Sequence, residues 1–141
     1  MSTGLTVGDL AKKHVYTLNV DDTVQAAAQL MRDKKIGSVV VIEGKEAKGI
    51  ITEGDIVRRV VAEGKPYTLA LKEVMSAPLI VVFPETELEE ALKAMTRHKV
   101  DRMVVITKEG YLAGIITKND ILNILPSIIE LVEEKAKLEA E

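Results

Sequence analysis

The spacing of apolar residues predicts an ordered series of helices and strands in the first half of the chain. Thr6 and Asp9 lie three residues apart and can form a capping box, which predicts a short helix there. Val24, Ala27 and Met31 recur at helical spacing, and two runs of β-branched residues flank a Gly-Lys turn, as in a hairpin. The predicted helix, strand, helix, two hairpin strands and final helix cover residues 6–9, 15–20, 24–31, 39–42, 47–51 and 53–62.

The second half of the chain repeats this pattern in the same order. The same residue types return in one register: Ala27, Met31, Lys35, Val40, Val41 and Ile42 as Ala91, Met95, Lys99, Val104, Val105 and Ile106. After one added residue, Gly49-Ile50-Ile51-Thr52 returns as Gly114-Ile115-Ile116-Thr117, and Asp55-Ile56 as Asp120-Ile121. Self-similarity of this kind indicates two copies of one structural unit.

The repeat fixes the expected organisation as an α+β protein made of two α-β-α-β-β-α copies. We expect copies at 7–62 and 71–126, joined by a linker at 63–70. A copy of about 60 residues buries little surface alone, so the two should pack on each other. Residues 127–141 should form an amphipathic helix that begins with the capping box Ser127–Glu130 and carries Ile128, Leu131, Val132, Lys135 and Leu138 on one stripe.

Composition and charge narrow the function classes. The 141 residues include no cysteine and two histidines, which argues against disulfides, thiolate chemistry and an imidazole-built metal site. The net charge of −3 arises in 127–141, which holds five Glu and two Lys, so no basic face for nucleic acid is expected. Apolar runs are too short to cross a bilayer, and the N-terminus lacks signal-peptide features. We therefore expect a cytoplasmic protein without membrane or nucleic-acid contacts.

The two Thr-x-x-Asp motifs, Thr52 to Asp55 and Thr117 to Asp120, are the candidate chemistry. One interpretation is a helix cap, in which Thr and Asp satisfy backbone donors. The other is that Asp accepts both ribose hydroxyls of a nucleotide while Thr and the helix start face a phosphate. Capping alone does not need the glycine that precedes each Thr by three residues, and this favours the second interpretation. The two interpretations are compatible.

Each repeat, with its Gly-Ile-Ile-Thr-x-x-Asp motif and preceding apolar strand, resembles the cystathionine-β-synthase (CBS) domain. The whole chain resembles a tandem pair, the Bateman module, although Gly54 and Asn119 stand where the family often has Ser or Thr. The resemblance implies two repeats packed sheet to sheet about a pseudo-two-fold axis, with two related clefts, and commonly dimerisation through helices. It also implies binding of adenosine compounds such as AMP, ADP, ATP, S-adenosylmethionine or dinucleotides.

The same resemblance implies the site residues. Each cleft should be composite, with the motif Asp of one repeat facing strand segments of the other, and Arg102 serving a phosphate beside Asp55. Apart from the resemblance, Lys118 sits inside the second motif beside Asp120, where it either reaches a phosphate or is a solvated surface lysine. The adenine walls should come from the segments before the first strands and at the start of the middle strands: Val15, Tyr16, Thr17, Ile36, Gly37 and Ser38 in the first copy, and Leu79, Ile80, Val81, Val100 and Asp101 in the second.

Three function classes follow: a sensor of an adenosine compound, a structural module and an enzyme. The favoured one is a regulatory sensor that binds an adenine nucleotide and signals to a partner protein, with no enzymatic activity, metal or cofactor. The alternatives are a structural dimerisation module without ligand, or a sensor of S-adenosylmethionine or a dinucleotide. A small nucleotide hydrolase also remains open, although the chain has neither a Gly-x-x-x-x-Gly-Lys loop nor a Ser/His/Asp set. We expect a homodimer, because Met31, Met95 and the alanines of their helices would otherwise expose apolar surface.

Overall fold

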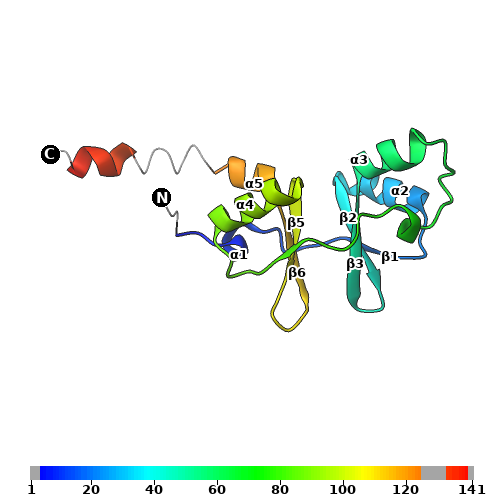
Figure 1. Ribbon diagram of the computed structural model, residues 1–141, viewed down its shortest axis with the longest axis horizontal. Helices are drawn as coiled ribbons and strands as arrows, with labels where there is room; N and C mark the ends of the chain where they lie inside the picture. Colours follow the sequence, from blue (N-terminus) through cyan, green and yellow to red (C-terminus); the bar gives the residue numbers. More distant parts are fainter. Residues whose placement is uncertain (1–3, 125–132, 140–141) are drawn as a thin grey trace. The chain divides into compact units, whose positions relative to one another are not determined.

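The computed structural model describes residues 4–124 and 133–139, and they form two compact units (Figure 1). Unit 1 combines the described residues of 1–13 with those of 81–141, and unit 2 consists of 14–80.

Unit 2 contains a three-stranded sheet of order β1-β2-β3, with strands Thr17–Asn19, Ser38–Glu43 and Glu46–Thr52. β1 runs parallel to β2, and β2 runs antiparallel to β3 across the predicted hairpin. The helices are α2 (Val24–Lys34), the single turn α3 (Glu53–Asp55), the π-helix η1 (Ile56–Val61) and the 3₁₀ turn η2 (Leu71–Glu73).

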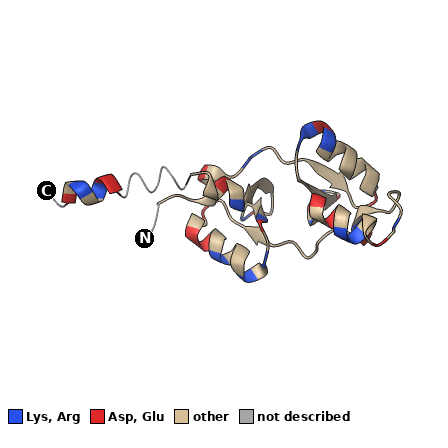
Figure 2. Ribbon diagram, turned by 90° about the horizontal axis from the view of Figure 1, so that it is seen from above, with Lys and Arg blue, Asp and Glu red and all other residues tan. Residues whose placement is uncertain are grey.

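Unit 1 repeats this arrangement with a sheet of order β4-β5-β6, whose strands are Val81–Val82, Arg102–Ile106 and Leu112–Thr117. Its helices are α1 (Val7–Leu10), α4 (Leu88–His98) and α5 (Lys118–Leu122). α4 carries acidic residues in its first turn and basic residues in its last (Figure 2), which complements the helix dipole.

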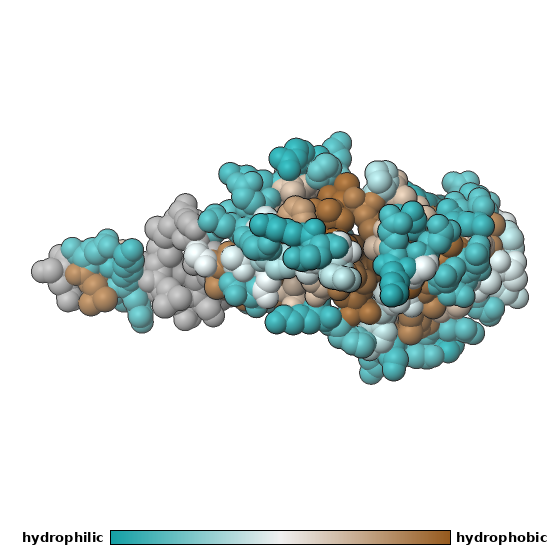
Figure 3. Space-filling view, turned by 90° about the horizontal axis from the view of Figure 1, so that it is seen from below, coloured by the Kyte–Doolittle hydropathy of each residue, from teal (hydrophilic) through white to brown (hydrophobic). Residues whose placement is uncertain are grey.

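The predicted order of elements and the α+β class are confirmed, with differences at the boundaries. β1 is shorter than the strand predicted over 15–20, and the helix predicted over 53–62 is one α-turn followed by a π-helix. Residues 133–139 are helical, and Leu138 among them is 74% exposed. Figure 3 shows a small apolar area among hydrophilic residues on this segment. The predicted cap at Ser127–Glu130 and the rest of that helix lie outside the described residues.

The segment that opens each sequence copy packs on the sheet of the other copy. Strap 1 (5–13) joins unit 1, where the backbone of Lys12 pairs with that of Ile115 in β6 through hydrogen bonds of 2.9 and 3.0 Å. Strap 2 (67–76) joins unit 2, where Ser76 pairs with Ile50 in β3 through hydrogen bonds of 2.8 and 3.1 Å. The compact units therefore divide the chain at different places from the sequence repeats.

The straps explain the glycine of each repeated motif. A Cβ atom on Gly49 would lie 2.8 Å from the carbonyl oxygen of Ser76, and one on Gly114 would lie 2.7 Å from that of Lys12. Both distances are shorter than real Cβ contacts. The glycine therefore admits the strap backbone, and its presence is no longer an argument for a ligand.

The core of each unit lies between its sheet and its helices. Val39, Val41 and Ile51 of the unit 2 sheet pack with Val24, Ala27 and Met31 of α2, and all are buried. Leu71 of strap 2 belongs to the same cluster, so the strap contributes to the core as well as to the sheet edge.

The expectation that Met31, Met95 and their neighbouring alanines expose apolar surface is wrong for most of them. Met31 and Met95 are 7% and 2% exposed, and Ala27 and Ala91 are fully buried. Their side chains point from α2 and α4 into the core of their own unit, because these positions form the inner helical stripe. Of the three alanines of α2, only Ala28 is exposed.

Candidate functional site

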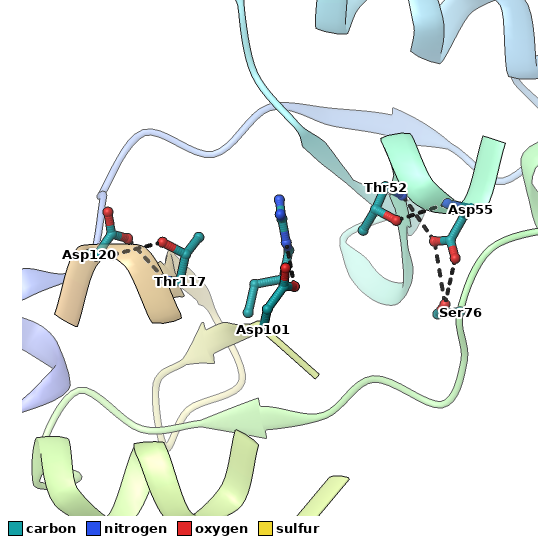
Figure 4. Close-up of polar contacts among 7 residues, drawn as sticks. Thr52, Asp55, Ser76, Asp101, Thr117 and Asp120 are labelled. Atoms are coloured by element: carbon teal, nitrogen blue, oxygen red, sulfur yellow. Dashed lines mark hydrogen bonds and ion pairs between the residues drawn. The ribbon is translucent and has the colours of Figure 1, made fainter. Parts of the chain in front are cut away.

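The Thr-x-x-Asp motifs occupy the same local structure in both units. Each Thr ends the last strand, and each Asp lies in the following helical turn. In unit 2 the Thr52 amide donates to Asp55 Oδ2 at 3.0 Å, and the Asp55 amide donates to Thr52 Oγ1 at 3.1 Å. In unit 1 the corresponding distances between Thr117 and Asp120 are also 3.0 and 3.1 Å (Figure 4). The capping interpretation is therefore confirmed in both copies.

Asp55 is buried, at 8% exposure, and its carboxylate faces strap 2. The Ser76 hydroxyl donates to its two oxygens at 3.4 and 3.5 Å (Figure 4), and Arg59 Nε lies 3.8 Å from Oδ1. The Arg59 guanidinium also donates to the carbonyl oxygens of Val74 and Met75 at 3.2 and 3.3 Å. Arg59 therefore holds strap 2 and compensates the charge of Asp55 at the same time.

Asp120 has a different neighbour on its strap. Lys12 Nζ lies 3.6 Å from Asp120 Oδ1, and the Lys12 side chain is 70% exposed while that of Asp120 is 15% exposed. Lys12 and Ser76 occupy equivalent positions in the two straps, since each pairs with the residue that follows the motif glycine. The two carboxylates thus have the same cap and different strap partners.

The starts of the middle strands lie beside the motifs within each unit. Ser38 pairs with Thr52 across the hairpin, and Arg102 pairs with Thr117. The Arg102 side chain, predicted to serve a phosphate, donates from Nε to Asp101 Oδ1 at 3.1 Å. This hydrogen bond holds the pKa of the Asp101 carboxyl below its ordinary value.

Lys118, the other predicted cation, follows Thr117 directly. Its backbone amide donates to the Asp101 carbonyl oxygen at 2.7 Å, as the Glu53 amide does to Gly37 at 3.1 Å in unit 2. Its side-chain charge contributes to the lowered pKa of Asp101. The structure thus brings Lys118, Asp101 and Arg102 together near the start of β5.

The predicted adenine walls are partly exposed segments beside these strand starts. In unit 2 the carbonyl oxygen of Tyr16 accepts a hydrogen bond from the Val40 amide at 3.0 Å. The Tyr16 ring contacts the His14 ring edge to face. Ile36 packs against the core cluster from the turn after α2. The remaining wall candidates show intermediate burial or, at Val81, 41% exposure; they are Val15, Thr17, Leu79, Ile80, Val81 and Val100.

Unit 2 also has an open, mainly apolar cavity on its helical side, with a volume of about 310 Å³. Its lining includes Ala28 and Met31 from α2, Ile36, and Ile56 and Val57 from η1. Val57 and Val61 of η1 are 58% and 69% exposed, so apolar surface extends along the π-helix.

Three residues near the carboxylates were not predicted from the sequence: Lys12, Arg59 and Ser76. The repeat did contain a signal for two of them, because Lys12 and Ser76 stand at the same place in their copies. The proximity of Lys12 and Ser76 to the aspartates depends on the exchange of straps, which local sequence patterns do not encode. Arg59 lies four residues after Asp55, about one helical turn away.

Among residues 4–124 and 133–139, no helix is long and apolar enough to span a bilayer. Within that same part of the chain, no group of three His, Asp or Glu side chains is arranged to hold a metal ion.

Comparison with known proteins supplies the family. The CBS domain model matches the chain twice, over residues 7–62 and 71–127. An uncharacterized protein of Methanopyrus kandleri is 38% identical over 135 residues, which cover 94% of this chain and 69% of that protein. The CBS domain-containing protein YhcV of Bacillus subtilis is 32% identical over 115 residues, which cover 82% of this chain and 81% of YhcV.

Solved structures share the fold. An uncharacterized conserved protein from Pyrococcus horikoshii superposes with a TM-score of 0.80 at 31% identity, covering 87% of this chain and 93% of the other. The CBS domain pair of protein MJ0100, solved in complex with 5′-methylthioadenosine and S-adenosyl-L-methionine, has a TM-score of 0.79 at 20% identity, covering 86% and 96%. At that identity the second likeness concerns the fold alone.

Proposed function

This chain belongs to the CBS domain family, whose tandem pairs are regulatory ligand-binding modules, and we propose that it senses an adenine nucleotide and signals to a partner protein. AMP, ADP and ATP are the proposed ligands, and Asp55 and Asp120 are the proposed ribose-binding groups. The protein acts in this proposal by binding and not by catalysis, which is supported by the two CBS domain matches over residues 7–62 and 71–127.

The observation that carries the proposal is the unequal use of the two oxygens of each motif carboxylate. In both units Oδ2 accepts a backbone hydrogen bond of 3.0 Å within the cap. The Oδ1 contacts are longer: 3.5 and 3.8 Å at Asp55, and 3.6 Å at Asp120. Hydrogen bonds to carboxylates are usually about 2.5–2.9 Å long, so Oδ1 retains capacity for a strong donor.

A ribose diol supplies such donors. Its two vicinal hydroxyls can donate to one carboxylate, which accepts several hydrogen bonds without leaving the cap. The cap fixes the carboxylate before the ligand arrives, so little side-chain entropy is lost on binding. Capping and ribose binding are therefore two uses of one group.

The test separates these two uses with a matched control. Asp9 caps α1 in the same way, because the Thr6 amide donates to Asp9 Oδ2 at 2.9 Å, but it lies outside the repeated motif. In an Asp120→Ala background, which leaves the unit 2 site to be observed alone, we compare Asp55→Ala with Asp9→Ala by calorimetric titration of AMP and by thermal melting.

Loss of a cap costs about 1 kcal/mol of stability, so both variants should melt earlier. Only Asp55→Ala should also lose AMP affinity, by about tenfold or more, since a hydrogen bond to a charged group is worth roughly 1.5–3 kcal/mol. Equal affinity in the two variants would leave Asp55 as a cap only and would refute its role in binding.

The ligand class is tested by a melting panel of AMP, ADP, ATP, S-adenosylmethionine, NAD and GTP. A ligand at about 100 times its Kd stabilises the folded state by about 2.7 kcal/mol. S-adenosylmethionine is included because the MJ0100 pair was solved with it. If no adenosine compound at millimolar concentration raises the melting temperature, the sensor proposal is wrong and the structural alternative replaces it.

The structural alternative has its own support in the helical side of unit 2. The cavity there and the exposed Val57 and Val61 form an apolar surface that a second copy of the chain would cover, so we also propose a homodimer. Val57→Lys should convert the dimer to monomer in light scattering, with Tyr111→Lys, at another exposed apolar position, as control. A wild-type monomer at tens of micromolar would refute the homodimer.

A further inference from the structure

We propose that Lys12 determines the ligand charge preferred by unit 1, so that the Asp120 site selects a phosphorylated adenosine compound over adenosine itself. This inference rests on the proposed function and adds to it a specificity-determining residue on strap 1. The same position of strap 2 holds Ser76, which makes the two units natural references for each other.

The backbone geometry places Lys12 beside the proposed ribose site. Its amide donates to Ile115 at 2.9 Å, and its carbonyl oxygen accepts from the same residue at 3.0 Å, so its Cα is fixed on the edge of β6. The strap backbone passes so close to Gly114 that a Cβ atom on this residue would meet the Lys12 carbonyl oxygen. The side chain therefore starts from a defined point next to the motif.

The side chain itself remains available. Lys12 Nζ lies 3.6 Å from Asp120 Oδ1, and its side chain is 70% exposed. Because the ammonium end of this ion pair is exposed and the contact is long, the Lys12 side chain contributes little to stability. An ammonium group on a flexible four-carbon stem can turn from the carboxylate to a phosphate oxygen without any change of backbone.

The cation of unit 2 is committed elsewhere. Arg59 donates to the Val74 and Met75 carbonyl oxygens and also faces Asp55. In unit 1 the position equivalent to Arg59 is Ile124, which carries no charge. Lys12 is therefore not accompanied by an arginine like Arg59 that faces the motif carboxylate. A guanidinium held by strap carbonyls is a structural tie, whereas the Lys12 ammonium has two further donor hydrogens for a ligand.

The neighbouring charges favour the same assignment. Lys118 follows Thr117, whereas Glu53 follows Thr52 at the equivalent place. Asp101 lies near Lys118, but its carboxylate is paired with Arg102. The Asp120 motif thus has a lysine on its strap and another on its own helix, and an anionic ligand gains from both.

The experiment exchanges the strap residues and measures a ratio of affinities. In an Asp55→Ala background, which leaves unit 1 to be observed alone, AMP and adenosine are titrated by calorimetry at two salt concentrations. Lys12→Ser is compared with Lys13→Ser, which removes the same charge from the adjacent, exposed position. The reciprocal variant, Ser76→Lys, is measured in an Asp120→Ala background.

With Lys12 present, AMP should bind about tenfold or more tightly than adenosine, and added salt should weaken AMP alone. Lys12→Ser should reduce that preference several-fold with adenosine affinity unchanged, and Lys13→Ser should leave it unchanged. Ser76→Lys should raise the preference for AMP in unit 2.

Two results overturn the inference while the proposed function survives. One is an AMP-to-adenosine ratio that Lys12→Ser does not change; the other is an equal loss of both affinities, which would make Lys12 a general contact. If neither compound binds to the Asp55→Ala protein with Lys12 in place, unit 1 has no such site and the inference fails. The proposed function fails as well only if the Asp120→Ala protein also binds neither compound.

Discussion

Replacing Gly49 by alanine tests the conclusion that the motif glycine serves the strap. The new Cβ would lie 2.8 Å from the Ser76 carbonyl oxygen and 2.6 Å from Met75 Sδ. The methionine side chain can move, but the carbonyl oxygen belongs to backbone that pairs with Ile50 through hydrogen bonds of 2.8 and 3.1 Å. Strap 2 must therefore shift, and that pairing weakens.

Inserting a methyl group into a packed site costs about 1–3 kcal/mol. Alanine also restricts the unfolded chain, which returns roughly 0.4–1 kcal/mol. The free energy of unfolding should therefore fall by about 1–2 kcal/mol. In urea denaturation this appears as a lower midpoint with an unchanged slope.

Gly54→Ala is the matched control in the same unit. Gly54 lies in α3, and the three atoms nearest to a Cβ there all belong to the flexible end of the Arg58 side chain. Because alanine is favoured over glycine in helices by roughly 0.5–1 kcal/mol, this variant should be neutral or more stable. If Gly49→Ala were as stable as Gly54→Ala, strap docking would not be the reason for the glycine.

Three further changes test separate parts of the structure. Val7 is fully buried in unit 1, so Val7→Ala should lower amide-exchange protection in residues 102–117 and spare 38–52; the reverse pattern would contradict the exchange of straps. Arg59→Met should lower the free energy of unfolding by about 1 kcal/mol, since it removes the hydrogen bonds to strap 2; unchanged stability would show that these bonds do not hold the strap. The pKa of Asp101 is lowered by Arg102, so this pair stabilises the fold above the unfolded pKa of about 3.9, and the benefit is lost as pH falls below that value. Asp101→Asn should therefore cost a few tenths of a kcal/mol at pH 7, because the Asp101 side chain is 69% exposed, and progressively less as the pH falls below that value; a cost that grows in acid would refute the assignment.

Much of each unit could be predicted because it depends on local patterns. Val24, Ala27 and Met31 have helical spacing, and the structure places all three on the buried stripe of α2. The Thr-x-x-Asp caps were equally predictable, since four consecutive residues determine their geometry. The repeat then carried each of these conclusions to the second copy.

What could not be predicted depends on pairing between distant segments. Nothing local to Lys12 indicates that it lies on β6 and not on the hairpin of its own copy. The motif glycine suggested a ligand until the position of the strap was known. The inward direction of Met95 was also misjudged, because a helix has two candidate faces until its packing against the sheet is seen.

The most direct test of the central claim, that the motif aspartates bind the ribose diol, is a thermodynamic cycle by calorimetric titration. AMP and its 2′,3′-dideoxy analogue are titrated into the Asp120→Ala protein with Asp55 either present or replaced by alanine. If Asp55 holds the diol, loss of either group should weaken binding by about tenfold, and loss of both should cost little more than loss of one. Costs that simply add would show that Asp55 and the diol do not interact and would contradict the claim.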